Sequence, residues 1–438
     1  MKEPKTLKQL AIPITLETLC YMLAGMIDTL MLSSVGDEAV GAVGTANTYI
    51  SMFVIMFSII SNGAVAVMTQ YIGAKKEGVA YQARNLGLIF NGSVGILLGF
   101  ILYYFAGSIL NSVGIAPSLS NYAVTYMKIV GGSCILNALI PIFSSYLRAF
   151  GHTKGPLIAT IIGNVVNLIF NSISLYILKW GVAGVACATV LSRVVNLAIV
   201  MILGKMIIHA KEDPNREKKH HIFNMILKVG LPSALETMAY NIAMTFIISF
   251  LNKMDNTGFY VTSRSYATQI ANFSFCFGAA LAQANAIQTG WRLGAGDYDR
   301  CDRGTRKAAF IGAVCASVFE GVIALSAPLY MPLFTDDPRM ALIVQQILFV
   351  DIILEFGRVT NLVYGQALKT SGDGIFTLII AVIFMYLCAV GGTYLLGIRL
   401  GLFVVGAHIA AASDEIVRAI CMGLRWRQGK WRKKALIK

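Results

Sequence analysis

The residues of this chain that could do chemistry are charged and amide side chains set within long apolar stretches. Hydrophobic residues make up 56% of the 438 residues, and only 13% are charged. A charge at the centre of a bilayer costs roughly 2.5 to 3.5 kcal/mol on insertion scales, so each ionisable residue in such a stretch is a candidate functional residue. The candidates in chain order are Glu17, Asp28, Glu236, Arg264, Glu320, Asp351, Glu355, Arg358, Asp414, Glu415 and Arg418, with Lys128 and Arg193 expected nearer the ends of their segments.

Asp28 is the carboxylate that best fits a site for a proton or a small cation. It follows Glu17 by eleven residues, which places both on nearly the same helix face, about 16 Å apart along the axis. In a later segment, Asn164, Asn167 and Asn171 lie at i, i+3 and i+7 and also share one face. One carboxylate with several amide oxygens could hold H+ or Na+, but the same asparagines could simply hydrogen-bond between helices. The residues alone leave both interpretations open.

A second polar cluster is expected in the second half of the chain. Asp351, Glu355 and Arg358 lie at i, i+4 and i+7 on one helix face, and Arg264 lies in an earlier segment. They could form a neutral structural network, or a gate or proton relay in which protonation of one carboxylate releases an arginine. Local ion pairing close to the inner end of the last segment is expected for Asp414, Glu415 and Arg418.

Two glutamates occupy the same setting 219 residues apart. Glu17 lies in "LETLCYM" and Glu236 in "LETMAYN", and each stretch begins three residues after a proline, Pro13 or Pro232. One interpretation places each glutamate in the first turn of the helix after the proline, where a carboxylate interacts well with exposed N–H groups. The other makes the prolines helix hinges whose bend changes when the neighbouring glutamate is protonated. Both interpretations predict the duplication.

The chain reads as a tandem of two similar halves. "IPITLETLCYM" aligns with "LPSALETMAYN" and "YLRAFGHTKGPL" with "ALKTSGDGIFTL", at offsets between 219 and 222 residues. Twelve apolar stretches reach the length of roughly 20 residues that a transmembrane helix needs. Because six is an even number, the two repeats enter the membrane in the same direction. We expect an all-α membrane protein of twelve transmembrane helices in two parallel six-helix repeats around a central cavity, with an N-lobe at 1–210, a cytoplasmic linker at 211–221 and a C-lobe at 222–438 that ends in a basic tail.

The distribution of basic residues predicts the orientation in the membrane. With loops assigned alternately, the segments on the side of the N-terminus hold 27 Lys and Arg residues and the opposite segments hold four. By the positive-inside rule, both termini are cytoplasmic in a multi-pass protein of the inner (plasma) membrane. The net charge of +14 is therefore no sign of nucleic-acid binding. The tail "RWRQGKWRKKALIK" is interpreted as an anchor to lipid headgroups.

Several motifs together resemble the multidrug and toxic compound extrusion (MATE) family. They are LR-x-x-G-x-T-K-x-P at Leu147–Pro156, LK-x-x-GD at Leu368–Asp373 and "GVAGVACAT" at the start of the sixth segment, and the resemblance covers essentially the whole chain. It implies a transporter that is functional as a monomer and exports small amphipathic organic substrates, such as cationic drugs, in exchange for inward H+ or Na+. It implies no cofactor beyond the coupling ion.

The resemblance also assigns residues of the first half. Asp28 matches the aspartate of the N-lobe cation site, Pro13 matches the proline where that helix bends, and Asn167 and Thr189 match further oxygen donors. Asn171 stands where many relatives carry a second aspartate, which leaves the choice between H+ and Na+ open. The implied metal site is a possible Na+ bound by Asp28, Asn167, Asn171 and Thr189.

The second half departs from the sodium site that some relatives have there. Glu236 lies about one turn before the glutamate of that site, and Arg358 falls near its usual aspartate. The stretch "EFGRVTN", beginning at Glu355, instead resembles an E-x-G-R-x-x-N variant of a bacterial branch of the family.

Two other classes of function were weighed against export. A lipid-linked oligosaccharide or lipid flippase of the same superfamily tends to have more helices and a strongly cationic cavity. An intramembrane enzyme is not expected, because the sequence has no HExxH, no GxSxG and no evident His/Asp pair in an apolar segment. We therefore expect an ion-coupled exporter rather than an enzyme.

Overall fold

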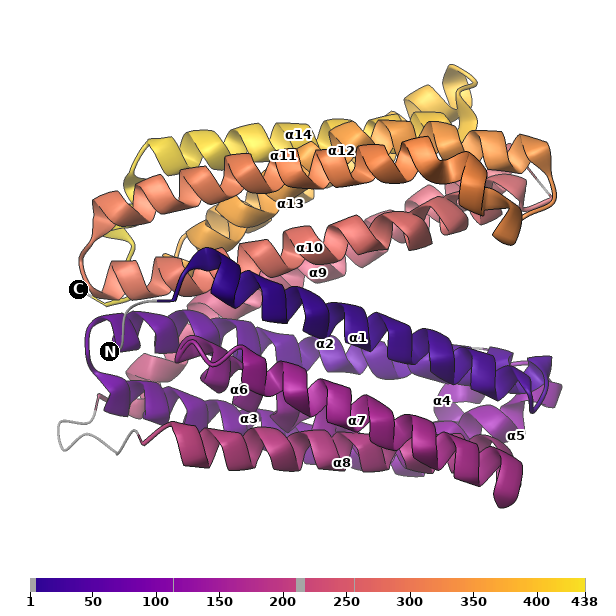
Figure 1. Cartoon of the computed structure of the whole chain (residues 1–438), viewed down its shortest axis with the longest axis horizontal. Coiled ribbons are helices and arrows are strands. Elements are labelled where there is room, and N and C mark those ends of the chain that lie inside the picture. Colours follow the sequence, from indigo (N-terminus) through magenta and orange to yellow (C-terminus); the bar gives the residue numbers. More distant parts are fainter. Residues whose placement is uncertain (1–4, 113, 210–216, 256, 438) are drawn as a thin grey trace. The chain divides into compact units, whose positions relative to one another are not determined.

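The structure of the chain consists of helices joined by short connections (Figure 1). The computed structural model describes residues 5–112, 114–209, 217–255 and 257–437, and every regular element within these ranges is helical. The predicted all-α class is confirmed. Within the described residues, ten helices are long and apolar enough to cross a membrane, or eleven if the pair bent by 44° at residues 117–149 counts as one span. The twelfth predicted segment is also a helix, but three charged side chains in its middle lower its hydropathy.

One compact unit contains Ile12–Leu231; we call it the first unit. Within it, α2 packs against α3, α5 and α6, and α8 packs against α6 and α7. The helices of this part of the chain, as far as the start of α9, are α1 (Leu7–Ser33), α2 (Asp37–Gly73), α3 (Glu77–Tyr104), α4 (Ala106–Ser112), α5 (Pro117–Tyr126), the π-helix η1 (Met127–Gly131), α6 (Cys134–Ala149), α7 (Lys154–Ser172), the π-helix η2 (Ile173–Ile177) and α8 (Gly181–Ile207).

The approach of α3 to its neighbours depends on a small residue and a buried amide. A Cβ atom on Gly95 would lie 2.8 Å from the Cβ of Ala138 on α6, so no larger residue fits without a shift. One turn earlier, the fully buried Asn91 donates to the backbone carbonyls of Phe57 on α2, at 3.2 Å, and Ala138, at 3.1 Å. Since a buried amide without partners costs stability, these bonds fix α3 against two helices at once.

The second unit contains Pro232–Lys438 together with Thr6–Ala11. Helix α12 is its centre, because it packs against α10, α11 and α14. The helices of this part of the chain are α9 (Lys219–Met254), α10 (Phe259–Gly294), α11 (Tyr298–Tyr330), the 3-10 helix η3 (Met331–Leu333), α12 (Pro338–Thr370), α13 (Gly374–Phe384), the π-helices η4 (Met385–Val390) and η5 (Thr393–Arg399), α14 (Phe403–Arg427) and the 3-10 helix η6 (Lys430–Lys433).

The boundary between the two units falls inside a helix at two places, in α1 and in α9. In α1 the change comes after Ala11, two residues before Pro13. In α9 it comes after Leu231, immediately before Pro232. Much of the predicted linker, residues 211–216, lies outside the described part of the chain. The limits given above for the two lobes therefore stay a prediction.

The basic tail folds back on the second unit. The rings of Trp426 and Trp431 stack with centroids 4.2 Å apart, and both side chains are almost fully buried. Trp426 donates through Nε1 to Asp302 at 2.7 Å, while Arg425 and Lys434 both pair with Asp373 in the turn before α13. The tryptophans are thus packed in protein, and the expectation that the tail serves as a lipid anchor is wrong for them.

Replacement of Trp431 by alanine should destabilise the protein. A buried tryptophan truncated to alanine typically loses about 3–5 kcal/mol through lost contacts and the cavity left behind. Chemical unfolding in mixed detergent micelles would measure the loss. Trp180→Ala is the matched control, since Trp180 is 58% exposed and should lose little. Equal unfolding free energies for the two variants would contradict the buried position of Trp431.

Candidate functional site

The first polar site lies between α1 and α7. Asn171 donates through its amide nitrogen to Asp28 Oδ1 at 2.7 Å and to Asn167 Oδ1 at 3.0 Å. Asn171 is fully buried, Asn167 is nearly so, and Asp28 is partly buried. The carboxylate and two of the predicted asparagines therefore form one chain of hydrogen bonds.

Two other residues expected at this site make different contacts. Asn164 donates to the backbone carbonyl of Cys20 on α1, at 2.9 Å, and so fastens α7 to α1 about two turns away from Asp28. The hydroxyl of Thr189 donates to the carbonyl of Val185 in its own helix, at 2.9 Å. Because this bond uses the hydroxyl hydrogen, the lone pairs of the hydroxyl oxygen can still accept a hydrogen bond or bind a cation.

Arg193 is the cation near this site, although the sequence placed it near the end of its segment and not beside Asp28. It lies in the middle of α8 rather than near an end, four residues after Thr189 and therefore on the same helix face. Arg193 is within electrostatic range of Asp28. Its Nη1 atom is buried and has no hydrogen-bond partner among the described residues. The i+4 spacing from Thr189 was the signal that could have placed it here.

The two duplicated glutamates form ion pairs at equivalent places in the repeats. Glu17 Oε1 lies 2.7 Å from Arg148 Nη2, and Glu236 Oε2 lies 2.7 Å from Lys369 Nζ. Arg148 is the basic residue of the LR-x-x-G stretch, and Lys369 is its counterpart in LK-x-x-GD. The first pair joins α1 to α6, and the second joins α9 to α12.

The interpretation of these glutamates as helix-start residues is wrong. Helix α1 begins at Leu7 and α9 at Lys219, so Pro13 and Pro232 lie inside the helices and the glutamates lie well past the first turn. A proline inside a helix removes one backbone hydrogen bond and favours a bend. The hinge interpretation of Pro13, Glu17 and Pro232 stays a prediction.

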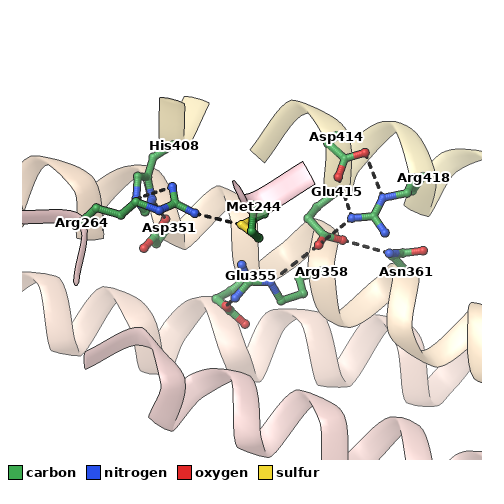
Figure 2. A network of polar contacts seen from close by, with 10 residues as sticks. All are labelled: Met244, Arg264, Asp351, Glu355, Arg358, Asn361, His408, Asp414, Glu415 and Arg418. Carbon is green, nitrogen blue, oxygen red and sulfur yellow. Dashed lines mark hydrogen bonds and ion pairs between the residues drawn. The ribbon is translucent and has the colours of Figure 1, made fainter. Parts of the chain in front are cut away.

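The E-x-G-R-x-x-N stretch on α12 makes polar contacts with α14 (Figure 2). Arg358 pairs with Glu355 at 2.6 Å and approaches Glu415 at 3.8 Å, while the amide of Asn361 donates to Glu415 at 2.9 Å. A Cβ on Gly357 would lie 2.9 Å from the backbone nitrogen of Ile416. Glycine thus permits the close approach of the two backbones that brings the polar side chains together.

The remaining charges of α14 complete this network. Arg418 binds both oxygens of Asp414, at 3.0 and 2.6 Å, and lies 2.9 Å from Glu415. The expected local pairing is therefore present, and Glu415 extends it to α12. Glu236, which the sequence predicts as part of the polar network of the second half, pairs with Lys369 and lies within electrostatic range of Arg418.

Arg264 and Asp351 meet through a histidine that the sequence analysis left out. His408 on α14 lies 2.9 Å from Asp351 through Nδ1, and Arg264 on α10 lies 3.5 Å from His408 Nε2. The expectation of no His/Asp pair in an apolar segment is wrong. Spacing within one segment predicts only contacts between residues of the same helix. His408 and Asp351 lie on two different helices and are 57 residues apart in the chain.

Glu320 on α11 is a buried carboxyl group without a visible partner. It is 0% exposed, and neither of its oxygens has a hydrogen-bond partner among the described residues. It lies within electrostatic range of Asp351, Glu355 and Arg358. Burial of an unpaired charge is costly, so this carboxyl group adds to the electrostatic balance of the polar network on α12.

Comparison with known proteins agrees with this arrangement of two units. The family profile MatE matches residues 13–173 and again residues 232–395, one match in each half of the chain. The chain belongs to the MATE family. It is accordingly a membrane transporter, and the two separate matches reflect the repeat that was read from the sequence.

Relatives of the MATE chain extend over nearly its whole length. It is 30% identical over 432 residues to the uncharacterized transporter YisQ of Bacillus subtilis, with 97% of this chain and 94% of that protein covered. It is 25% identical to the probable multidrug resistance protein NorM of Thermotoga maritima, over 99% of this chain and 94% of that protein.

Solved structures show the same fold. An outward-facing multidrug resistance MATE family transporter of the MOP superfamily matches with a TM-score of 0.88 and 21% identity, over 98% of this chain and 96% of that chain. A MOP superfamily transporter from Pyrococcus furiosus matches with a TM-score of 0.85 and 21% identity, over 97% and 95% of the two chains.

Breaking the repeated ion pairs of this MATE protein should cost stability in proportion to their burial. Removing one partner of a buried pair typically costs about 3–5 kcal/mol. We expect Glu17→Gln to approach this loss, and Glu236→Gln to lose less, because the Glu17 side chain is 3% exposed and that of Glu236 is 22% exposed. Chemical unfolding of the single variants and of the Glu17→Gln/Arg148→Gln double variant measures the coupling. Strictly additive losses would show that Glu17 and Arg148 do not interact.

Proposed function

We propose that this protein is a secondary active antiporter that exports amphipathic and cationic drugs across the plasma membrane in exchange for inward protons. The observation that carries the proposal is the Asp28 site, where one carboxylate on α1 accepts from the buried Asn171 on α7, which also donates to Asn167. The probable multidrug resistance protein NorM, a relative over the whole length, supports drugs as the substrate class. Both termini are proposed to be cytoplasmic.

The electrostatics of the site favour H+ over Na+ as the coupling ion. The group of Asn171 that faces Asp28 is its amide nitrogen, a donor, whereas Na+ requires oxygen ligands. The guanidinium of Arg193 already supplies a positive charge near the carboxylate. Binding of either ion adds a positive charge beside this guanidinium, but a proton needs only one carboxylate oxygen, whereas Na+ needs several oxygen ligands. We therefore infer proton coupling at Asp28.

The proposed cycle follows from the change of charge at Asp28. When the carboxylate is ionised, it attracts Arg193 and accepts the amide of Asn171. When it is protonated, the attraction to Arg193 is lost, and α1 is free to bend near Pro13. In the proposal, this bend is linked to the alternating exposure of the two lobes, and the drug leaves as the proton enters.

Asp28→Asn should abolish proton-driven export while the protein remains folded. The amide keeps the shape of the side chain but cannot exchange a proton. Uptake of a lipophilic cation into proteoliposomes with an imposed pH gradient measures the activity, and thermal unfolding checks the fold. Asp336→Asn, at an exposed position, is the matched control. Export at the wild-type rate by the Asp28 variant would remove this carboxylate from the mechanism.

Arg193→Gln should make the transporter respond to sodium. Without the guanidinium, the carboxylate can attract Na+, so we expect export driven by a sodium gradient to rise at least threefold above that of the wild type. Arg193→Lys keeps the charge and should stay insensitive to sodium. The measurement compares drug export under a sodium gradient and under a pH gradient. A wild-type protein driven by sodium alone would refute the proposed ion.

A further inference from the structure

His408 lies between a carboxylate and a guanidinium in the interior of the second unit (Figure 2). Its Nδ1 is 2.9 Å from Asp351 Oδ1, and its Nε2 is 3.5 Å from Arg264 Nη1. His408 is 4% exposed and Asp351 is 3% exposed, so bulk water does not screen this row of charges. The three residues come from α14, α12 and α10, and each is fixed by a different helix.

The two contacts determine where the imidazole carries its proton. Arginine has only donors, so the Arg264 contact is a hydrogen bond only if His408 Nε2 accepts it. Asp351 is an acceptor, so His408 Nδ1 must carry the hydrogen that it donates to the carboxylate. The arrangement therefore describes a neutral histidine with its proton on Nδ1.

A second proton on His408 would reverse the contact with Arg264. The Nε2 atom would become a donor, and two cationic donors would face each other with no acceptor between them. Asp351 could not relieve this, because it already binds the other side of the ring. An anion placed between Nε2 and the guanidinium would accept from both groups and offset the repulsion.

Among the described residues, Arg264 makes no contact with a carboxylate, unlike Arg358 and Arg418. Arg358 pairs with Glu355, and Arg418 pairs with Asp414. The other contact of Arg264 is the sulfur of Met244 at 3.3 Å, which is a weak acceptor. Compared with the other two arginines, Arg264 retains donors for a ligand.

The space beside Arg264 is suited to a small group. A cavity of about 60 Å³ lies in this unit, and its wall includes both Arg264 and His408. Thr268 and Asn272, one and two turns after Arg264 on α10, also line it and offer further polar contacts. A group the size of acetate fits such a volume, whereas a whole drug does not.

We propose that Arg264 and the protonated form of His408 bind the carboxylate of a small organic acid, and that each carboxylate binds together with one proton. The planar guanidinium matches a carboxylate in shape, and the Nε2–H group donates to the same anion. This site is separate from the Asp28 site, and it goes beyond drug export, since its ligand is an anion.

Other charged groups surround His408 and set the balance of charge. Helix α13 with η4 contributes only apolar lining residues to the cavity wall. The titratable and charged groups of the remaining elements around the cavity are Tyr240 on α9, Arg264 on α10, Glu320 on α11, Asp351, Glu355 and Arg358 on α12, and Asp414, Glu415 and Arg418 on α14. The carboxylates nearest to Arg358 and Arg418 are engaged by these arginines, so Asp351 is the one that holds the ring in place.

The test measures the Kd of acetate for the full chain in detergent. Saturation-transfer NMR detects the binding at pH values from 5.5 to 8. One linked proton predicts that the Kd rises about tenfold per pH unit once His408 is neutral. Acetamide, which has the same shape but no charge, should not bind. An acetate Kd that does not change with pH would overturn the proposal, and so would equal binding of acetamide.

Two variants assign the effect to these residues. His408→Gln keeps a donor for Asp351 and an acceptor for Arg264 but cannot become charged, so at pH 5.5 it should bind acetate at least tenfold more weakly and without pH dependence. Arg264→Gln should also bind at least tenfold more weakly. His209→Gln changes an exposed histidine and should leave the Kd unchanged. A folded His408→Gln protein that keeps the wild-type pH dependence would refute the proposal, and the acetate and acetamide comparison on the wild type decides it if that variant does not fold.

Discussion

The structure depends on one constraint, which is that an ionised side chain inside an apolar helix bundle must meet an opposite charge or a strong hydrogen-bonding group. The repeat satisfies this constraint twice in the same way. Glu17 on α1 meets Arg148 on α6, and Glu236 on α9 meets Lys369 on α12. In each half, an acid after a proline and a base before a glycine turn tie the first helix of the repeat to the fourth. A chain with only one member of such a pair would carry an uncompensated buried charge.

The two halves use the same framework for different polar interiors. The first unit holds one carboxylate, a pair of asparagines and one arginine around α1, α7 and α8. The second unit holds a continuous network on α12 and α14, and Gly357 allows the backbones to approach closely enough for it to form. A sparse site can change its charge with a single proton. A dense network distributes such a change over several partners, which is why the two sites call for different ligands.

Much of the fold could be predicted from the sequence, because the signals are periodic and local. Apolar stretches of sufficient length predicted the helices, and the offset matches predicted the repeat. The shared face of Asn167 and Asn171 agrees with the hydrogen bond between them, and Asn171 also donates to Asp28. What failed was the choice of partner between helices. Periodicity indicates which side of a helix is polar but not which neighbour that side faces. His408 was therefore not among the candidates, and Arg193 was a candidate that was not assigned to Asp28. The helix-start interpretation of the residues after the prolines also failed, since both helices continue through Pro13 and Pro232.

The passage of the chain between its two units has a consequence for any attempt to divide the protein. Because α1 changes unit after Ala11 and α9 changes unit after Leu231, the initial turns of each helix belong to the unit that does not hold the rest of that helix. Cutting the gene at residues 211–221 would separate the start of α9, up to Leu231, from the first unit to which it belongs. The upstream fragment would lack these core residues, and the downstream fragment would carry them without the helices on which they pack. The duplicated halves are thus no longer separable modules, and co-expressed fragments would have to exchange these ends in order to assemble.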